Sequence, residues 1–404
     1  MAAFHLMAKP AGAACNLACG YCFYLEKKDL FPAGRSLRMT PETLRAYIAA
    51  TIAAQNIPEV QFTWQGGEPL LMGLEFFQLA VDLQRQLADG KTIRNTIQTN
   101  GTLLDDRWCE FFRREGFLVG LSLDGPRHIH DPGRPDKRGR PSFDAVLAGL
   151  RRLGKHEVEV NVLVTVARHV APHPQAVYDF LKSEGVTFIQ FNPVVERIGL
   201  PPPPAAPGAA DVTADTVGAA DYGDFLIGVF DDWVRHDVGV VHVMNFEWAL
   251  AAWCQLPATV CLFARRCGDA AIVEHDGSVY SCDHYVYPGY RLGSLGEDGP
   301  AAMLASPAQQ AFGAAKETSL PDYCRQCPHL FACRGECPKN RFATTPAGAP
   351  GLNYLCPSYK AFFRHVTPAM NGMAQLLAAG RPAAEVMKAF KGPLAIVKSP
   401  PHRV

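Results

Sequence analysis

The first half of the chain alternates short apolar runs with longer segments in which apolar residues recur every three or four positions. The short runs predict strands and the longer segments predict amphipathic helices. The predicted strands span residues 4–9, 60–64, 92–98, 117–123, 158–166 and 188–194. The predicted helices span residues 41–54, 74–88, 105–115, 142–155, 173–185 and 222–235. Strands that alternate with helices indicate an α/β fold with parallel strands and about six strand–helix units.

Local signals set several of these boundaries. Thr40 precedes Pro41, which is typical of a helix that begins with a capping side chain and a proline at its first position. Ser142 is predicted to cap its helix in the same way. Cys109 lies among large apolar residues at helical spacing, so we expect it to be a buried core thiol. The polar segment 128–140 follows a predicted strand, and its Asp and Gly residues suit ordinary turn chemistry.

The pattern changes after residue 200. Residues 200–217 are rich in Pro, Ala and Gly and predict a flexible loop. Beyond residue 239 the predicted elements are short, with a hairpin whose turn is residues 274–278. We therefore predict three parts: an α/β domain over 1–238, a loop-rich domain over 239–370, and an Ala-rich helical tail over 371–404.

Composition narrows the class of protein. Lys plus Arg and Asp plus Glu each number 39, which argues against a broad surface for nucleic acid or anionic membrane. No apolar run is long enough to span a membrane, and the first ten residues have no apolar core of signal-peptide length. Thirteen cysteines without a secretion signal favour a reducing, cytoplasmic compartment and bound metal rather than disulfides.

Three of these cysteines, Cys15, Cys19 and Cys22, have the spacing C-x3-C-x2-C directly after the first predicted strand. An all-cysteine [4Fe–4S] cluster needs four thiolates, so three would leave one iron open to a small molecule. A zinc knuckle is the alternative, but structural zinc prefers four ligands and no Cys or His follows Cys22 closely. The spacing therefore favours an open iron–sulfur cluster.

Eight further cysteines lie in the loop-rich part, enough for two more four-cysteine clusters. They are Cys261, Cys267, Cys282, Cys324, Cys327, Cys333, Cys337 and Cys356. Two zinc ribbons are the alternative, since Cys324 and Cys327 have a spacing that suits zinc. Cys109 and Cys254 are left over as structural or free thiols.

The triad, with Tyr21 before its third cysteine, resembles the signature of radical S-adenosylmethionine (radical SAM) enzymes. The resemblance implies a partial (β/α)6 barrel over 1–238. It also implies that S-adenosylmethionine chelates the open iron and is cleaved to a 5′-deoxyadenosyl radical. Gly66-Gly67-Glu68 resembles the family's motif for the cofactor's amino group, although Gly-Gly before Pro also suits an ordinary turn. The residues expected to bind the cofactor are Tyr21, Gly66, Gly67, Glu68, Ser122, Arg134 and Val195.

The loop-rich part resembles the SPASM extension of radical SAM peptide-modifying enzymes. The resemblance implies two auxiliary [4Fe–4S] clusters, which brings the total to three. Auxiliary cluster I would be held by Cys261, Cys267, Cys282 and Cys337, and auxiliary cluster II by Cys324, Cys327, Cys333 and Cys356. Cys254 is a rival for the first position, with a spacing to Cys267 that fits less well.

Residues 278–285 (SVYSCDHY) and 353–359 (NYLCPSY) resemble the anaerobic sulfatase-maturating enzymes more narrowly. That family oxidises a Cys or Ser of an unfolded sulfatase to Cα-formylglycine. The resemblance places Asp283 as the proton acceptor, with Tyr24 and Gln65 lining the substrate. His275 and His284 are rival bases on general chemical grounds.

The same resemblance implies an unfolded sulfatase polypeptide with a C/S-x-P/A-x-R motif as substrate, and flavodoxin or ferredoxin as electron donor. We expect neither nucleic acid nor a membrane as partner. One alternative is a radical SAM–SPASM enzyme that forms a thioether or carbon–carbon crosslink in another peptide. Another is a zinc-binding adaptor without catalytic activity. Iron and sulfide content separates the adaptor from both enzymes.

Overall fold

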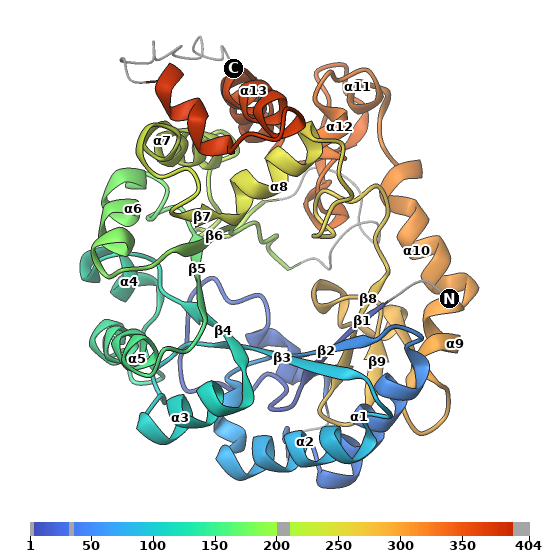
Figure 1. Ribbon diagram of the computed structural model, residues 1–404. Helices are drawn as coiled ribbons and strands as arrows, with labels where there is room; N and C mark the ends of the chain where they lie inside the picture. The colour runs from blue at the N-terminus through green and yellow to red at the C-terminus, as the bar shows by residue number, and fades with distance from the viewer. Residues whose placement is uncertain (1–3, 32–35, 200–210, 391–404) are drawn as a thin grey trace. The chain divides into compact units, whose positions relative to one another are not determined.

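The computed structural model describes residues 4–31, 36–199 and 211–390 (Figure 1). Backbone contacts divide the chain into two compact units. The first unit comprises Met1–Leu123, Arg127–Leu163 and Arg266–Thr318, and the second comprises Asp124–Pro126, Val164–Arg265 and Ser319–Val404. Residues 266–318 of the cysteine-rich third thus group with the first strands of the chain.

The first unit contains most of the sheet. Its strands are β1 (His5–Lys9), β2 (Glu59–Trp64), β3 (Thr92–Thr99), β4 (Phe117–Ser122), the beginning of β5 (Val160–Val166), β8 (Ala270–Glu274), β9 (Ser278–Tyr280) and β10 (Arg291–Ser294). Its α-helices are α1 (Pro41–Ala54), α2 (Leu74–Leu87), α3 (Asp106–Glu115), α4 (Arg127–Gly133), α5 (Phe143–Lys155), α9 (Pro300–Ala305) and α10 (Pro307–Thr318). Its 3₁₀ helices are η1 (Leu25–Leu30), η2 (Pro69–Met72), η3 (Asp283–Tyr285) and η4 (Pro288–Tyr290).

The strand order in this unit is β10-β9-β8-β1-β2-β3-β4-β5. Strands β8, β1, β2, β3, β4 and β5 are parallel to their neighbours in that order, and β9 and β10 are antiparallel additions. Parallel strands end at one edge of a sheet, so the loops after β1, β2, β3, β4 and β8 share that edge. The cysteine triad follows β1, and Cys282 follows the β8–β9 hairpin.

Amphipathic helices cover one face of these strands, with α1, α2 and α3 outside β1–β4 in Figure 1. The helix α1 begins as predicted, because the Thr40 side chain accepts a hydrogen bond from the Thr43 backbone N–H at 3.2 Å. Aromatic rings fill the space between helices and sheet. Trp64 is fully buried, and its ring lies 5.6 Å from Tyr47 and 5.7 Å from Phe77, measured between centroids. This edge-to-face packing adds to the burial energy of the core. Cys109 is fully buried there, as predicted.

The segment after β4 contains a short helix that was not predicted, α4 (Arg127–Gly133). The Ser142 side chain does not cap α5; its hydroxyl donates to the Arg134 carbonyl at 2.6 Å. The Asp131 carboxylate accepts from the backbone N–H of Ser142 (3.1 Å) and of Phe143 (2.9 Å) instead. A capping residue eleven positions upstream has no local sequence signal.

The second unit is mainly helical. Its strands are the end of β5, β6 (Phe188–Pro193), β7 (His242–Val243), β11 (Ala343–Thr344) and β12 (Pro350–Leu352). Its α-helices are α6 (Pro174–Ser183), α7 (Asp221–His236), α8 (Met244–Trp253), α11 (Asp322–Arg325), α12 (Leu330–Cys333) and α13 (Cys356–Ala378), with 3₁₀ helices η5 (Pro338–Asn340) and η6 (Ala383–Ala389). β6 and β7 pair in parallel.

Close packing of α7 against the start of α13 organises this unit. A Cβ atom on Gly223 would lie 2.6 Å from the Ser358 Cα, so only glycine allows the helices to approach this far. The Ser358 hydroxyl accepts from the Gly223 N–H at 2.8 Å and donates to the Ala219 carbonyl at 2.7 Å. The boundary predicted at residue 370 lies inside α13, because its buried face continues to Met373.

Two predicted segments lie partly outside the described residues: 200–210 of the Pro/Ala-rich loop and 391–404 of the tail. At the described end of that loop, Val212 forms a bridge with Arg197. Within the ranges that the structure does describe, no helix combines the length and the apolar character that a membrane span requires.

Candidate cluster and cofactor sites

The loop that carries the cysteine triad is tied to the end of β3. The Asn100 side-chain amide points at Cys15 Sγ from 3.7 Å and donates to Asn16 Oδ1 at 2.9 Å. The Leu17 backbone N–H also donates to Cys15 Sγ, at 3.4 Å. These donors favour the thiolate, the form in which cysteine binds metal, and they oppose the burial that raises the pKa of Cys15 to about 11. This donor set fits an iron–sulfur cluster. Sequence reasoning missed Asn100, whose only signal was its place after a strand.

The Gly66–Gly67–Glu68 loop after β2 is bonded to the residues before Cys15. The Gly67 N–H donates to the Gly12 carbonyl at 2.7 Å, and the Glu68 N–H donates to the Ala14 carbonyl at 2.8 Å. A Cβ atom on Gly67 would lie 1.9 Å from the Ala14 oxygen. The glycine therefore allows two backbones to lie side by side next to the triad.

Gly67→Ala is expected to displace the triad loop, because the added methyl group cannot be accommodated against backbone. We expect the affinity for S-adenosylmethionine to fall by about tenfold or more, since small misplacements at such sites are costly. Equilibrium binding to iron-loaded protein measures the effect. Gly154→Ala is the matched control, because its Cβ would meet no atom within 4 Å. Unchanged affinity in the Gly67 variant would show that the two loops do not depend on each other.

Glu68 is fully buried and bonded on both carboxylate oxygens. Oε1 accepts from the Leu70 N–H (3.0 Å) and the Thr99 hydroxyl (2.8 Å), and Oε2 accepts from the Asn100 N–H (2.7 Å). Burial raises the pKa of Glu68 to about 7, although these three hydrogen bonds oppose the rise. A carboxylate offers about four acceptor positions, so one position remains for an ammonium group. Its role in binding the cofactor stays a prediction.

Tyr21 and Arg134 are brought together. The Arg134 guanidinium lies 5.4 Å from the centre of the Tyr21 ring, and its side chain is buried. The neighbouring backbones are bonded as well: the Ala18 N–H donates to the Pro135 carbonyl at 2.8 Å, and Leu17 forms a bridge with Asp136. The segment after α4 thus lies against the triad loop, as a shared binding site requires.

Two other residues expected to bind the cofactor have partners of their own. The Ser122 hydroxyl, at the end of β4, accepts from Gln98 Nε2 at 3.0 Å. Val195 belongs to the second unit, where it is buried and its carbonyl accepts from Lys339 Nζ at 2.7 Å. The expectation that they contact the cofactor stays a prediction.

Asp283 follows Cys282 at the start of η3 and is half-buried. Its Oδ1 accepts from the His284 backbone N–H at 2.9 Å and from the Cys282 thiol at 3.3 Å. Burial alone raises the pKa of Asp283, but the positive charges of His284 and Lys9 and the two hydrogen bonds outweigh it and lower the pKa to about 2. A carboxylate that is ionised at neutral pH can accept a proton.

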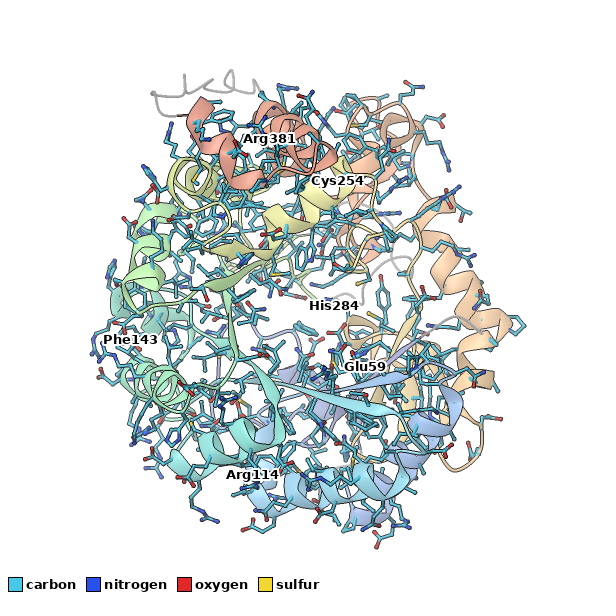
Figure 2. All side chains as sticks on the ribbon, in the orientation of Figure 1. Glu59, Arg114, Phe143, Cys254, His284 and Arg381 are labelled. Atoms are coloured by element: carbon cyan, nitrogen blue, oxygen red, sulfur yellow. The ribbon has the colours of Figure 1, made fainter. Side chains whose placement is uncertain are left out.

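The two rival bases have different surroundings. His284, labelled in Figure 2, lies beside Phe23, with ring centroids 4.5 Å apart. His275 is buried, and its Nδ1 lies 3.2 Å from Glu274 Oε2. The His284 imidazole therefore packs against an aromatic ring, whereas the His275 imidazole is bonded to a buried carboxylate.

Four cysteines of the second unit line one small cavity of about 30 Å³. They are Cys324, Cys327, Cys333 and Cys356, the set expected to hold auxiliary cluster II. Burial raises the pKa of Cys333 to about 12 and that of Cys356 to about 11, so these thiols would have to lose their protons on binding metal. Thiolates converging on one cavity fit a four-cysteine cluster.

The ligands expected for auxiliary cluster I are divided between the units. Cys267 and Cys282 belong to the first unit, where the buried Gln309 side chain donates to the carbonyls of Gly268 (2.8 Å) and Ser281 (3.3 Å). These two hydrogen bonds hold together the backbones next to Cys267 and Cys282. In the second unit, Cys261 and Cys337 interact electrostatically.

Buried polar side chains that sequence reasoning missed also frame the cysteine loop of the second unit. The Arg341 guanidinium donates to the carbonyls of Gly335 (2.9 Å) and Arg334 (3.1 Å). The buried Glu336 accepts from the side chains of Asn340 and Asn353.

Within residues 4–31, 36–199 and 211–390, no three His, Cys, Asp or Glu side chains are arranged to hold a single metal ion. Cys254, labelled in Figure 2, directly follows α8.

Comparison with known proteins identifies the family to which the chain is similar. The Radical SAM superfamily profile matches residues 10–181, and that of the SPASM iron–sulfur cluster-binding domain matches residues 261–328. A serine-type anaerobic sulfatase-maturating enzyme from Bacteroides thetaiotaomicron is 45% identical over 96% of this chain and 95% of its own length. A cysteine-type enzyme from Clostridium perfringens is 32% identical over 91% of this chain and 98% of its own length.

The fold agrees as well. A solved structure described as native anSMEcpe with bound AdoMet is similar with a TM-score of 0.82 and 32% identity, over 92% of this chain and 99% of that one. Streptococcus suis SuiB bound to the precursor peptide SuiA has a TM-score of 0.61 at 13% identity, over 88% of this chain and 76% of that one, a likeness of fold alone. The predicted partial radical SAM barrel with a SPASM domain is confirmed.

Proposed function

Because this chain belongs to the anaerobic sulfatase-maturating enzyme family, we propose that it oxidises one serine or cysteine of a sulfatase polypeptide to Cα-formylglycine. The match of 45% identity over nearly the whole length of both chains carries the proposal. The site supports it, since the triad loop and the Glu68 loop are bonded to each other.

The ligands follow from this function. Cys15, Cys19 and Cys22 would hold the cluster that binds S-adenosylmethionine, and the two sets of four cysteines would hold the auxiliary clusters. When bound, these groups would supply the electron that cleaves S-adenosylmethionine, the radical that takes a hydrogen atom from the substrate β-carbon, and an acceptor for the electron the substrate then loses. Tyr21 and Arg134, which are already in contact, would hold the cofactor beside the triad.

Asp283 would take the proton of the substrate thiol or hydroxyl. Its low pKa keeps it ionised at neutral pH, and its Oδ1 is oriented by the His284 backbone N–H. Loss of the proton, one hydrogen atom and one electron converts CH₂–OH to an aldehyde and CH₂–SH to a thioaldehyde, which water hydrolyses. Tyr24, directly before η1, and Gln65, directly after β2, would line the substrate.

The similarities favour serine as the target residue. Serine-type relatives from two Klebsiella species are each 40% identical to this chain, against 32% for the cysteine-type relative. We propose that the substrate carries a C/S-x-P/A-x-R motif in an unfolded segment and that a flavodoxin or ferredoxin supplies the electron. We also propose a cytoplasmic location, which thirteen cysteines without any disulfide support.

Mass spectrometry of a synthetic sulfatase peptide tests this function. The peptide, with serine or cysteine at the target position, is incubated anaerobically with iron-loaded enzyme, S-adenosylmethionine and a strong reductant. We expect the serine peptide to lose two hydrogen atoms and the cysteine peptide to exchange SH and H for an aldehyde oxygen. Deoxyadenosine with both peptides unchanged would contradict the proposal and favour another peptide substrate.

Binding of S-adenosylmethionine is expected to depend on pH through Glu68. An ammonium group binds to the ionised carboxylate, and the pKa of Glu68 is about 7, so the affinity should rise as pH rises through 7. Below that pH the dissociation constant should increase by up to about tenfold per pH unit. Equilibrium binding between pH 6 and 8 measures this, and Glu68→Gln should remove the dependence. A wild-type affinity constant across the range would show that Glu68 does not bind the cofactor as a carboxylate.

A further inference from the structure

A lysine is buried at the active-site end of the sheet. Lys9 is the last residue of β1, and its side chain is only 1% exposed. A buried ammonium group is costly unless nearby groups compensate its charge. Its position matters, because the triad loop begins directly after β1. So far this lysine has entered only through its charge, which helps to lower the pKa of Asp283.

The partners of Lys9 are two residues expected to line the substrate. Its ammonium donates to Gln65 Oε1 at 3.3 Å and lies 4.6 Å from the centre of the Tyr24 ring. A cation over a desolvated tyrosine ring is an attractive contact. Among the residues that the structure describes, Gln65 is the one hydrogen-bond acceptor of this ammonium. Lys9 therefore connects the loop after β1 to the end of β2.

Tyr24 in turn connects Lys9 to a buried carboxylate. The Tyr24 hydroxyl donates to Oε1 of Glu274, the last residue of β8, which is fully buried. Glu274 Oε2 accepts from the His275 backbone N–H at 3.3 Å and lies 3.2 Å from His275 Nδ1.

These contacts form one buried polar network that consists of Lys9, Tyr24, Gln65, Glu274 and His275. Tyr24 connects the two opposite charges of this network, because the Lys9 ammonium lies over its ring and the Glu274 carboxylate accepts from its hydroxyl. Lys9 and Tyr24 both interact electrostatically with Asp283, the proposed proton acceptor. The network therefore joins β1, β2 and β8 around the place where the substrate side chain would react.

We propose that Lys9 and Glu274 are positioning residues that fix Tyr24 and Gln65 against the substrate, and that they set how much formylglycine forms for each S-adenosylmethionine cleaved. This inference rests on the proposed function. Cleavage of S-adenosylmethionine needs the cofactor and the triad, whereas hydrogen abstraction also needs the substrate β-carbon to be held close to the radical. A misplacement of about 1 Å can cost about a hundredfold in rate. Loss of the network should therefore affect product formation far more than cleavage.

The test compares formylglycine with 5′-deoxyadenosine for wild type and variants, using iron-loaded full-length enzyme and the serine peptide. Lys9→Met keeps the length of the side chain and removes its charge. We expect the ratio of formylglycine to deoxyadenosine to fall by about tenfold or more, with deoxyadenosine formation retained. A merely structural role would lower both products together through loss of active enzyme and would leave their ratio unchanged.

Lys27→Met is the matched control. Lys27 is also buried in the first unit, with its ammonium 3.5 Å from the centre of the Tyr287 ring and 3.0 Å from Glu26 Oε1. Its side chain makes the same type of cation–ring contact, but with Tyr287, and its bond to Tyr24 is a backbone one (Lys27 N–H to the Tyr24 carbonyl, 3.1 Å) that Lys27→Met keeps. The product ratio should equal that of wild type. A ratio that falls equally in both lysine variants would overturn the proposal.

Denaturant unfolding of the iron-loaded variants gives a second readout that does not depend on activity. Lys9→Met removes the buried cation that interacts with the Glu274 and Asp283 carboxylates, and Glu274→Gln leaves the Lys9 ammonium with Asp283 as its remaining carboxylate partner. The double variant removes both charges, so its loss of stability should be smaller than the sum of the two single losses. Additive losses would show that the two charges do not compensate each other and would contradict the network.

Tyr24→Phe tests the same proposal if the Lys9→Met variant does not fold. It keeps the ring under Lys9 and removes only the hydroxyl that bonds to Glu274. The product ratio should fall in the same direction, and an unchanged ratio would overturn the proposal. Deoxyadenosine without any formylglycine from wild-type enzyme would instead contradict the proposed function itself, so the two failures are distinguishable.

Discussion

Asp283→Asn is expected to lower the rate of formylglycine formation by about two to four orders of magnitude, the usual contribution of a general base. The asparagine keeps the shape of the side chain and its bond from the His284 N–H, but it cannot take up the proton of the substrate thiol or hydroxyl. Cleavage of S-adenosylmethionine does not require that proton transfer. Deoxyadenosine should therefore still form, and its excess over formylglycine is the expected signature, measured by chromatography and mass spectrometry on the same samples.

Two controls separate Asp283 from its neighbours. Asp276→Asn changes an exposed carboxylate on the β8–β9 turn, which accepts a hydrogen bond from the Ser278 N–H at 2.9 Å, and should leave the rate unchanged. His284→Gln removes the rival base next to Asp283. If His284→Gln lost all activity while Asp283→Asn stayed active, the proton acceptor would have to be His284.

Replacement of Cys15, Cys19 and Cys22 together by alanine should abolish deoxyadenosine formation and remove about one third of the bound iron, because one of three four-iron clusters is lost. The eight cysteines assigned to the auxiliary clusters are unchanged, so the remaining iron and its absorption should persist. Iron and sulfide analysis and deoxyadenosine assay of anaerobically reconstituted protein measure both effects.

Cys254→Ala is the matched control for the triad variant. Cys254 is half-buried after α8 and is not assigned to any cluster. The iron content and activity of the Cys254→Ala variant should equal those of wild type. Loss of a cluster in this variant would show that Cys254 is a ligand, as the rival assignment for auxiliary cluster I requires. Deoxyadenosine formation by the triad variant would exclude these cysteines as the site of cleavage.

Local sequence signals predicted the elements of the barrel well. The predicted helix over 41–54 is α1 (Pro41–Ala54), because the Thr40 cap and Pro41 fix its start chemically. The predicted hairpin around residues 274–278 is β8 and β9. In both cases the determining contacts lie within a few residues of one another. Where a contact is distant, as for Asp131 capping α5, the same reasoning failed.

The sequence did not reveal how the cysteine-rich third joins the barrel. β8 pairs in parallel with β1, with His5 opposite Ala270 and Lys9 opposite Glu274, across more than half of the chain. No pattern within either strand specifies this partner. The pairing places Glu274 close to Tyr24. It explains why the buried polar network was not predicted, because its members come from segments that are far apart in the sequence.

The candidate sites divide in the same way. Cysteine spacing and the resemblance to known families pointed to the cluster ligands, and the structure gathers Cys324, Cys327, Cys333 and Cys356 around one cavity. The supporting residues were not predicted. Asn100 and Gln309 have no distinctive sequence context, and their role appears only when the fold brings them next to the cysteine loops.

The most direct test of the account uses a serine peptide that carries deuterium on the β-carbon of the target residue. Enzyme, S-adenosylmethionine and reductant are incubated with this peptide, and the deoxyadenosine is analysed by mass spectrometry. The account predicts that deuterium moves into 5′-deoxyadenosine as formylglycine forms. Formylglycine accompanied by deoxyadenosine without deuterium would contradict it, because the hydrogen would then have been removed by something other than the deoxyadenosyl radical.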